Sequence, residues 1–153
     1  MFASTKRLNL RAFQESDGER TLAFLYDRSV AKTSSPDYIA PKSEAQTLKN
    51  SLSFIEGCLV YLIIEIKAEE APTKDVSSEG DRWAGFVALR QQTKRNREVL
   101  VSVSLLPRWW DKGFGTEVLG WIVNYAFEDL GMHRVGLHLI SNNERAIAVY
   151  KRL

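Results

Sequence analysis

Residues 107–116, Pro-Arg-Trp-Trp-Asp-Lys-Gly-Phe-Gly-Thr, decide the fold of this chain because they separate two segments of different periodicity. The segment before them, residues 98–106, is rich in β-branched and apolar residues and predicts a β-strand. The segment after them, residues 113–130, is apolar around almost its whole circumference and predicts a helix largely surrounded by protein. The sequence therefore predicts a strand, a glycine-containing loop and a buried helix in succession.

The loop residues have the chemistry of an anion site. Gly113 and Gly115 carry no Cβ, so the backbone there approaches a ligand closely. The first N–H groups of a helix lack internal partners, and the helix dipole places positive charge at that end. Lys112 and Arg108 add charge nearby. The pattern favours a phosphate group, although a tight strand–helix turn alone would also explain the two glycines. The spacing of a nucleoside-triphosphate loop is absent, and so is the third glycine of a dinucleotide fingerprint.

The remaining elements alternate with polar loops. Further strands are predicted at residues 8–12, 58–66, 83–90 and 133–140, and further helices at 16–29, 43–57 and 143–153. The order is therefore β-α-α-β-β-β-α-β-α, an α+β fold in one domain spanning residues 1–153.

Two capping boxes, in residues 16–19 (Ser-x-x-Glu) and 43–46 (Ser-x-x-Gln), predict where the first two helices begin. In the second helix, Leu48, Leu52 and Ile55 are spaced to form a buried stripe.

The composition excludes several classes of protein. The 153 residues are 44% apolar and 26% charged, with a net charge of +2, which excludes a disordered or collagen-like chain. One cysteine, Cys58, and two histidines are too few for a disulfide framework or a Cys/His cluster, so we expect no metal site. No apolar run approaches the ~20 residues of a membrane helix, and no signal peptide precedes residue 8. We therefore expect a cytoplasmic protein without a membrane partner.

A second motif lies in the last predicted helix, at Asn143-x-x-Ala146-x-x-Val149-Tyr150-x-x-Leu153. Asn143 is a good helix cap, and Tyr150 follows it about two turns later on the same face. A capped amphipathic helix with a core tyrosine would explain this pattern without any ligand.

Together the two motifs resemble the GNAT family of N-acetyltransferases. The family's acetyl-CoA signature, Gln/Arg-x-x-Gly-x-Gly/Ala, corresponds to residues 110–115, with Trp110 in place of Gln or Arg. More narrowly, residues 110–117 are similar to the Trp-Gly-Lys-Gly-Tyr/Phe-Ala/Gly-Thr-Glu form of the ribosomal-protein N-terminal acetyltransferase branch, except at Asp111. The resemblance implies a twisted, mostly antiparallel sheet flanked by helices. It also implies one parallel strand pair, between residues 98–106 and 133–140.

The resemblance also implies an acetyl-CoA cosubstrate and transfer of its acetyl group to a primary amine, either a protein N-terminus or a small molecule. The loop amides would hold the CoA pyrophosphate, from Lys112, Gly113, Phe114, Gly115 and Thr116. The strand end at Leu105 and Leu106 would receive the pantetheine arm, and a backbone N–H near Leu105 would polarise the thioester carbonyl. Asn143 would hydrogen-bond the arm, and Tyr150 would protonate the departing thiolate.

The general base is less defined. Glu98, at the start of its strand, corresponds most nearly to the family's carboxylate, and His138 is an alternative. Ser102 and Ser104 share one face of that strand and could line a path of water. Tyr38, in the loop between the first two helices, is a candidate contact to the acceptor.

Two other functions explain parts of the pattern. A CoA-binding protein of the same fold without catalysis would explain the absence of a carboxylate in the middle of the 98–106 strand. A nucleic-acid-binding module would use the basic residues 90–97 with Trp109 and Trp110, although the net charge gives it little support. Family members usually continue beyond the tyrosine helix with two further strands. We therefore expect a C-terminally incomplete domain, whose open sheet edge a second copy could cover in a homodimer.

Overall fold

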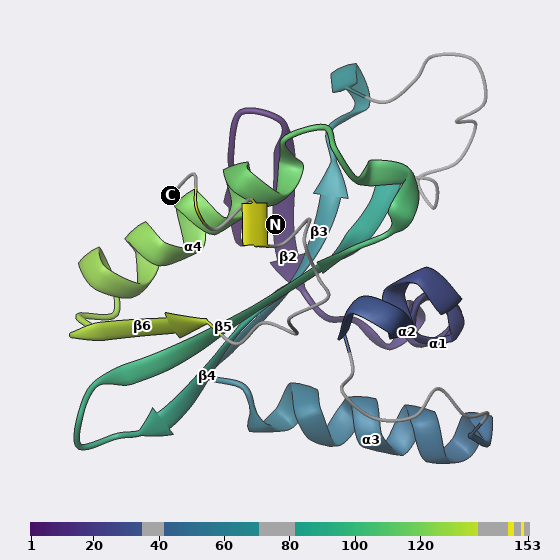
Figure 1. The fold of residues 1–153 in the computed structure, drawn as a ribbon, viewed down its shortest axis with the longest axis horizontal. Helices are drawn as coiled ribbons and strands as arrows, with labels where there is room; N and C mark the ends of the chain where they lie inside the picture. The colour runs from purple at the N-terminus through teal and green to yellow at the C-terminus, as the bar shows by residue number, and fades with distance from the viewer. Residues whose placement is uncertain (35–41, 71–81, 138–146, 149–150, 152–153) are drawn as a thin grey trace.

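The computed structural model describes residues 1–34, 42–70, 82–137, 147–148 and 151 (Figure 1). Within these ranges, six strands form one sheet in which every strand pairs with its neighbours in the sequence. The strands are β1 (Ala3–Ser4), β2 (Leu8–Ala12), β3 (Val60–Ile66), β4 (Trp83–Thr93), β5 (Glu98–Leu105) and β6 (Arg134–Leu137). The α-helices are α1 (Gly18–Tyr26), α2 (Arg28–Ser34), α3 (Glu44–Gly57) and α4 (Phe114–Glu128). Short 3-10 turns are η1 (Glu15–Asp17), η2 (Ala68–Glu70) and η4 (Pro107–Trp109).

The sheet is antiparallel except at one edge. There β5 and β6 run parallel, with a register from Glu98 opposite Arg134 to Val101 opposite Leu137. The predicted parallel pair is therefore confirmed, and so is the α+β fold with a mostly antiparallel sheet.

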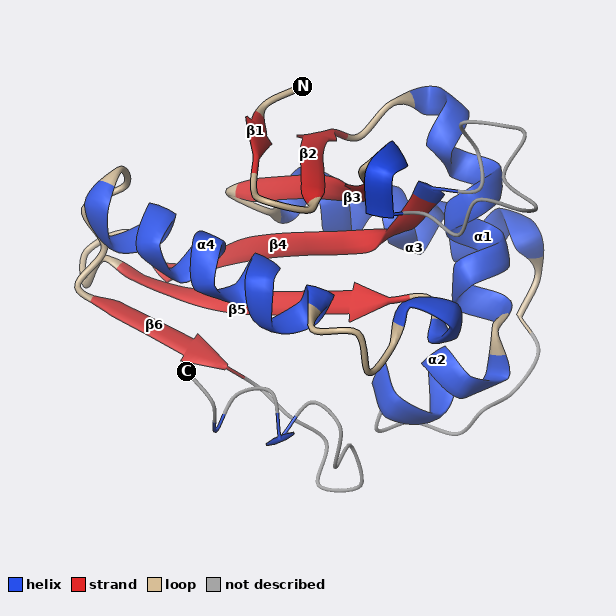
Figure 2. Cartoon of the chain, turned by 90° about the horizontal axis from the view of Figure 1, so that it is seen from above, coloured by secondary structure: helices blue, strands red, loops and turns tan. Residues whose placement is uncertain are grey.

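Helices cover both faces of the sheet. Figures 1 and 2 show α4 along one face and α1, α2 and α3 on the other. The main core lies between α4 and the sheet, where Val118, Leu119 and Ile122 pack against apolar residues of β2 to β5. A smaller core on the opposite face contains Phe24, Val30, Ile63 and Trp83. Because side chains alternate along a strand, β3 and β4 contribute residues to both cores.

The predicted helix over residues 16–29 is divided in the structure. Asp17 ends the short turn η1, and its carboxylate accepts a hydrogen bond from the Gln14 amide at 2.8 Å. The predicted cap at Ser16 is therefore wrong. Asp27 then separates α1 from α2, because its backbone is extended and its Oδ1 accepts from the amides of Ser29 and Val30. An acidic residue satisfies the unpaired donors at a helix start, and this makes the break stable.

The predicted start of α3 is confirmed, since Ser43 Oγ accepts from the Gln46 amide at 3.1 Å. Two predictions about how deeply helices are buried need correction. The expected buried stripe is wrong, because Leu52 is 40% exposed and α3 has no fully buried residue. Helix α4 is buried on one face only, and Phe127 on its other side is 43% exposed.

Among the helices in the described ranges, none has the length and apolar composition needed to cross a bilayer. The predicted strand at 133–140 is observed over Arg134–Leu137. Residues 138–140 and most of the predicted helix at 143–153 lie outside the described residues.

Candidate acetyl-CoA site

The junction between β5 and α4 presents the backbone of a helix start. Gly113 is the N-cap of α4 and has φ +81°, a conformation that favours glycine. The first intrahelical hydrogen bond runs from the Glu117 amide to the Gly113 carbonyl at 3.1 Å. The amides of Phe114, Gly115 and Thr116 therefore have no acceptor within the helix, as is required of amides that donate to a bound anion.

Trp110 connects this loop to the end of β5. Its indole Nε1 donates to the Leu105 carbonyl oxygen at 2.8 Å. This bond gives a structural role to the residue that departs from the family's signature. It places the loop beside the strand end that was predicted to receive the pantetheine arm.

The backbone at the end of β5 is oriented by β4. The Leu106 amide donates to the Ala84 carbonyl at 2.8 Å, so this donor faces β4. Because successive peptide groups in a strand point to opposite sides, the Leu105 N–H points away from β4, toward the side where β6 lies. Of the two neighbouring amides, Leu105 therefore has the orientation needed to reach a ligand at the β6 side of the strand.

A carboxylate in the first turn of α4 would repel an anion, and the structure compensates this charge. Glu117 Oε1 accepts from the Thr5 hydroxyl at 2.5 Å and from the Arg7 amide at 2.8 Å. Glu117 Oε2 accepts from Arg7 Nε at 2.6 Å. Partial burial alone would raise the pKa of Glu117, but the hydrogen bonds from Thr5 and Arg7 hold this pKa below its ordinary value. Thr5 and Arg7 were not among the predicted site residues, because they contact α4 and the loop from a distant part of the chain.

The residues present suit the pyrophosphate of a CoA molecule. The loop offers amides of a helix start and a left-handed glycine, with the exposed Lys112 beside it. The nearby carboxylate of Glu117 is neutralised by Arg7. Together these features make the helix start electrostatically suitable for a polyanion.

Glu98 is not brought to this loop. It begins β5 and Leu105 ends it, a separation of about 23 Å along an extended strand. The Glu98 carboxylate lies 3.6 Å from Arg134 Nε in a partly exposed ion pair. The structure therefore places Glu98 at the opposite end of β5 from Leu105, and its role as general base stays a prediction. Ser102 and Ser104 are half-buried on β5, between Glu98 and Leu105.

Four other predicted residues lie outside the described part of the chain: Asn143, Tyr150, His138 and Tyr38. Their roles stay predictions. The described residues contain no group of three or more His, Cys, Asp or Glu side chains that could hold a metal ion.

The features expected of a nucleic-acid-binding surface are not assembled. Trp109 is only 4% exposed and packs against Phe114, while the indole N–H of Trp110 is used by Leu105. The buried ring of Trp109 is not presented for stacking on a base, and Trp110 is half-buried against the main core. In the basic segment, Arg97 donates to the Gly131 carbonyl, and Arg90 lies over the Phe54 ring at 5.4 Å.

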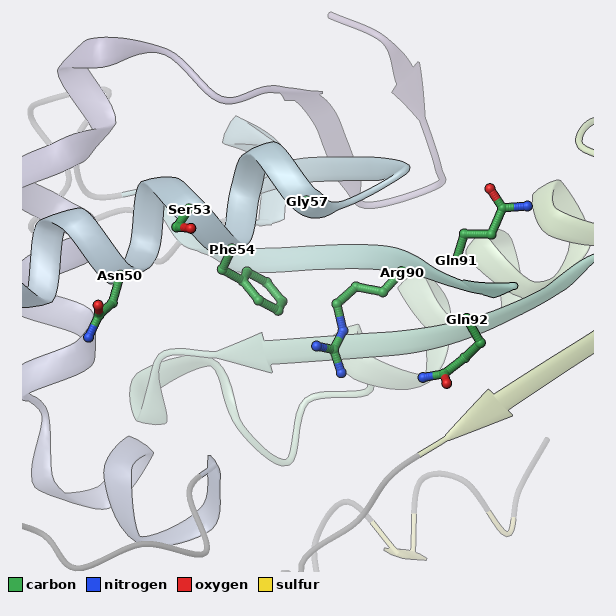
Figure 3. A pocket seen from close by; sticks show the side chains of 7 residues that line it. All are labelled: Asn50, Ser53, Phe54, Gly57, Arg90, Gln91 and Gln92. Atoms are coloured by element: carbon green, nitrogen blue, oxygen red, sulfur yellow. The ribbon is translucent and has the colours of Figure 1, made fainter. Parts of the chain in front are cut away.

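A shallow pocket lies away from the loop, between α3 and the end of β4 (Figure 3). Its lining is Asn50, Ser53, Phe54, Gly57, Arg90, Gln91 and Gln92. Cys58 follows this end of α3, and burial raises the pKa of its thiol, although Arg90 opposes the shift. A thiol with a raised pKa is a poor nucleophile at neutral pH. None of the predicted cofactor residues lines this pocket.

Comparison with known proteins decides the family. Residues 7–153 match the family model described as "Acetyltransferase (GNAT) domain". The chain belongs to the GNAT acetyltransferase family. This GNAT domain is 35% identical over 144 residues to the uncharacterized N-acetyltransferase YoaA of Bacillus subtilis, covering 92% of this chain and 74% of that protein.

Solved structures share the fold of this GNAT domain. A GNAT-family acetyltransferase from Bacillus anthracis matches with a TM-score of 0.75 and 18% identity, over 99% of this chain and 81% of that one. The spermidine N-acetyltransferase of Vibrio cholerae, solved with CoA and spermine, matches with a TM-score of 0.70 and 18% identity. That match covers 97% of this chain and 80% of the Vibrio protein.

Proposed function

We propose that this GNAT domain transfers an acetyl group from acetyl-CoA to a primary amine by direct attack of the amine on the thioester. The junction between β5 and α4 carries the proposal, because it combines a helix start suited to pyrophosphate with a strand end suited to the pantetheine arm. Membership of an acetyltransferase family supports the same reaction.

In this proposal the main chain binds the cosubstrate. The amides of Gly113 to Thr116 donate to the pyrophosphate, and Lys112 adds a positive charge at the entrance. The arm lies along the end of β5 beside Leu105 and Leu106, and Asn143 donates to one of its amide carbonyls. Acetyl-CoA supplies the activated acyl group, and the chain supplies its orientation.

The chemistry needs two proton movements. The amine nitrogen forms a bond to the thioester carbonyl carbon while the Leu105 N–H stabilises charge that develops on the carbonyl oxygen. The carbon–sulfur bond then breaks, and Tyr150 donates its phenolic proton to the departing thiolate. The proton that the attacking nitrogen loses passes to water, for which Ser102 and Ser104 offer hydroxyl groups. Glu98 has no chemical role in this scheme because of its distance from Leu105.

The acceptor class is a primary amine. The Vibrio relative is named for spermidine, and the narrower resemblance of residues 110–117 to the ribosomal-protein branch favours a protein N-terminus. Both acceptors carry an amine that must be neutral to attack, so turnover should rise with pH up to the pKa of the acceptor. A screen of acetyl-CoA turnover over polyamines, other small amines and N-terminal peptides, read by release of the CoA thiol, selects between them.

Replacing Tyr150 tests directly whether the protein catalyses acetyl transfer. We expect Tyr150→Phe to lower kcat by about 100-fold, the usual contribution of a general acid, while the Kd of acetyl-CoA stays within about twofold. The matched control is Tyr125→Phe, because Tyr125 stacks on Trp121 on α4 and faces Phe2. Binding of acetyl-CoA without turnover of any amine by the unmodified protein would instead identify a CoA-binding protein.

A further inference from the structure

The guanidinium of Arg7 contacts three successive residues of the cofactor loop. Arg7 lies in the turn between β1 and β2, which Figure 1 shows beside the start of α4. Its Nη1 donates to the Lys112 carbonyl at 2.9 Å, and its Cζ lies 4.4 Å from the centroid of the Phe114 ring. A Cβ on Gly113 would lie 3.1 Å from Arg7 Nη2, so the guanidinium also packs closely on the glycine.

The bond to Lys112 sets the direction of the next amide. A trans peptide is planar, so the carbonyl of one residue and the N–H of the next point in opposite directions. Because the Lys112 carbonyl points to Arg7, the Gly113 N–H points away from Arg7. The same guanidinium holds Phe114 by stacking and Glu117 by an ion pair, so both ends of the first helical turn are attached to one side chain.

Arg7 affects the loop mainly by fixing its geometry and only weakly through its charge. Its positive charge is paired with Glu117 at 2.6 Å, and this pair has little net charge to offer a ligand. The planar fork of an arginine can donate to a carboxylate and a carbonyl at once while stacking on a ring. A lysine would keep the charge but could not make these contacts together.

We infer that Arg7 is a positioning residue for the pyrophosphate site, so the β1–β2 turn is part of the cofactor-binding machinery. This inference rests on the proposed function. Arg7 holds the Lys112–Gly113 peptide and the first turn of α4 in the conformation that directs their amides to the anion. An anion site formed by main-chain donors depends on such a brace, because flexible amides lose affinity when they must be ordered on binding.

The test replaces Arg7 by lysine and measures acetyl-CoA binding by titration calorimetry. We expect Arg7→Lys to raise the Kd and the KM of acetyl-CoA about tenfold, with kcat changed by less than about twofold. The matched control is Arg11→Lys, since Arg11 also makes a forked ion pair but is bonded to Asp17 and Glu65 instead of the loop. That control should lower the melting temperature without changing the Kd of the folded protein. An unchanged Kd in Arg7→Lys, or an equal rise in both variants, would overturn the inference.

A second measurement separates this inference from the proposed function. In the protein without ligand, amide hydrogen exchange at residues 113–117 should speed up about tenfold in Arg7→Lys, while exchange in β3 and β4 stays unchanged. Unchanged exchange at the loop would overturn the bracing role. If the unmodified protein fails to bind acetyl-CoA, the proposed function fails, and the exchange rates still decide whether Arg7 orders the loop. Should Arg7→Lys not fold, Glu117→Gln weakens the same anchor and must speed up amide exchange at residues 113–117.

Discussion

Asp111 occupies a backbone conformation that suits glycine better. Its φ is +58°, where the Cβ of an L-residue crowds the carbonyl oxygen. The family branch that residues 110–117 resemble has glycine at this point of the loop. The departure noted in the sequence therefore has a structural cost, although aspartate tolerates this region better than most residues.

Replacing Asp111 should relieve this strain. We expect Asp111→Gly to raise the free energy of unfolding by about 0.5 kcal/mol, measured by urea denaturation. Asp111→Ala keeps the Cβ in the same conformation and should give no gain. Equal stabilities of the two variants would show that the positive φ carries no cost here.

At the scale of elements, the end of β5 depends on a glycine in β4. Gly85 lies opposite Leu105 and has φ +148°. A Cβ at this position would lie 2.0 Å from the Ser104 carbonyl oxygen, and that atom belongs to the backbone and cannot turn aside. The two strands therefore approach closely where the pantetheine arm is proposed to lie, and Gly85 permits this approach.

An added methyl group should disrupt this approach. We expect Gly85→Ala to lower the free energy of unfolding by about 3 kcal/mol, because overpacking and backbone strain act together. In Gly120→Ala, within α4, the new methyl group meets nothing within 4 Å. That control should gain about 0.5–1 kcal/mol in helix propensity. Similar stability of the two variants would contradict the strand geometry described here.

Elements that are formed by local sequence signals could be predicted, whereas contacts between distant segments could not. The β5–loop–α4 unit was predictable because its apolar periods and glycines are local signals. The division at Asp27 was overlooked, although an aspartate before Ser29 and Val30 is itself a capping signal. The stripe of α3 was wrong because helical spacing shows which residues share a face but not how deeply that face is buried. Arg7 could not be predicted, since its role depends on how the sheet brings distant segments together.

At the scale of the whole molecule, one ion network joins three elements on the face opposite α4. Arg11 on β2 donates to both carboxylate oxygens of Asp17 at 2.7 and 2.8 Å, and to Glu65 on β3 at 2.7 Å. The pKa of Arg11 is raised chiefly by its hydrogen bond to Asp17. Asp17 is 1% exposed; burial would raise its pKa, but the bonds from Arg11 and the Gln14 amide hold this pKa below its ordinary value.

This network predicts a specific acid sensitivity. Because the pKa of Asp17 is lower in the folded than in the unfolded chain, its contribution is present above the unfolded value of about 4. The contribution is lost as the pH falls through the folded pKa. We expect Asp17→Asn to lower the free energy of unfolding by about 3 kcal/mol at pH 7, because Arg11 loses its buried partner. The free energy of unfolding of this variant should also depend less on pH between 7 and 3. Urea denaturation from pH 7 to pH 3 measures both effects. The control Glu70→Gln changes an exposed carboxylate and should leave the pH dependence of the free energy of unfolding unchanged. If Asp17→Asn lowered the free energy of unfolding equally at every pH, the link between Asp17 and acid sensitivity would be disproved.

The brace on the cofactor loop also constrains the order of folding. Arg7 and Glu117 are 110 positions apart in the chain, and Thr5 and Glu117 are 112 apart. Contacts of such separation close late, because the intervening chain must first lose its freedom. During synthesis the β2–β3–β4–β5 meander can therefore assemble before α4 packs against the β1–β2 turn, which is synthesised first. Competence to bind the cosubstrate is then one of the last properties that the folding chain acquires.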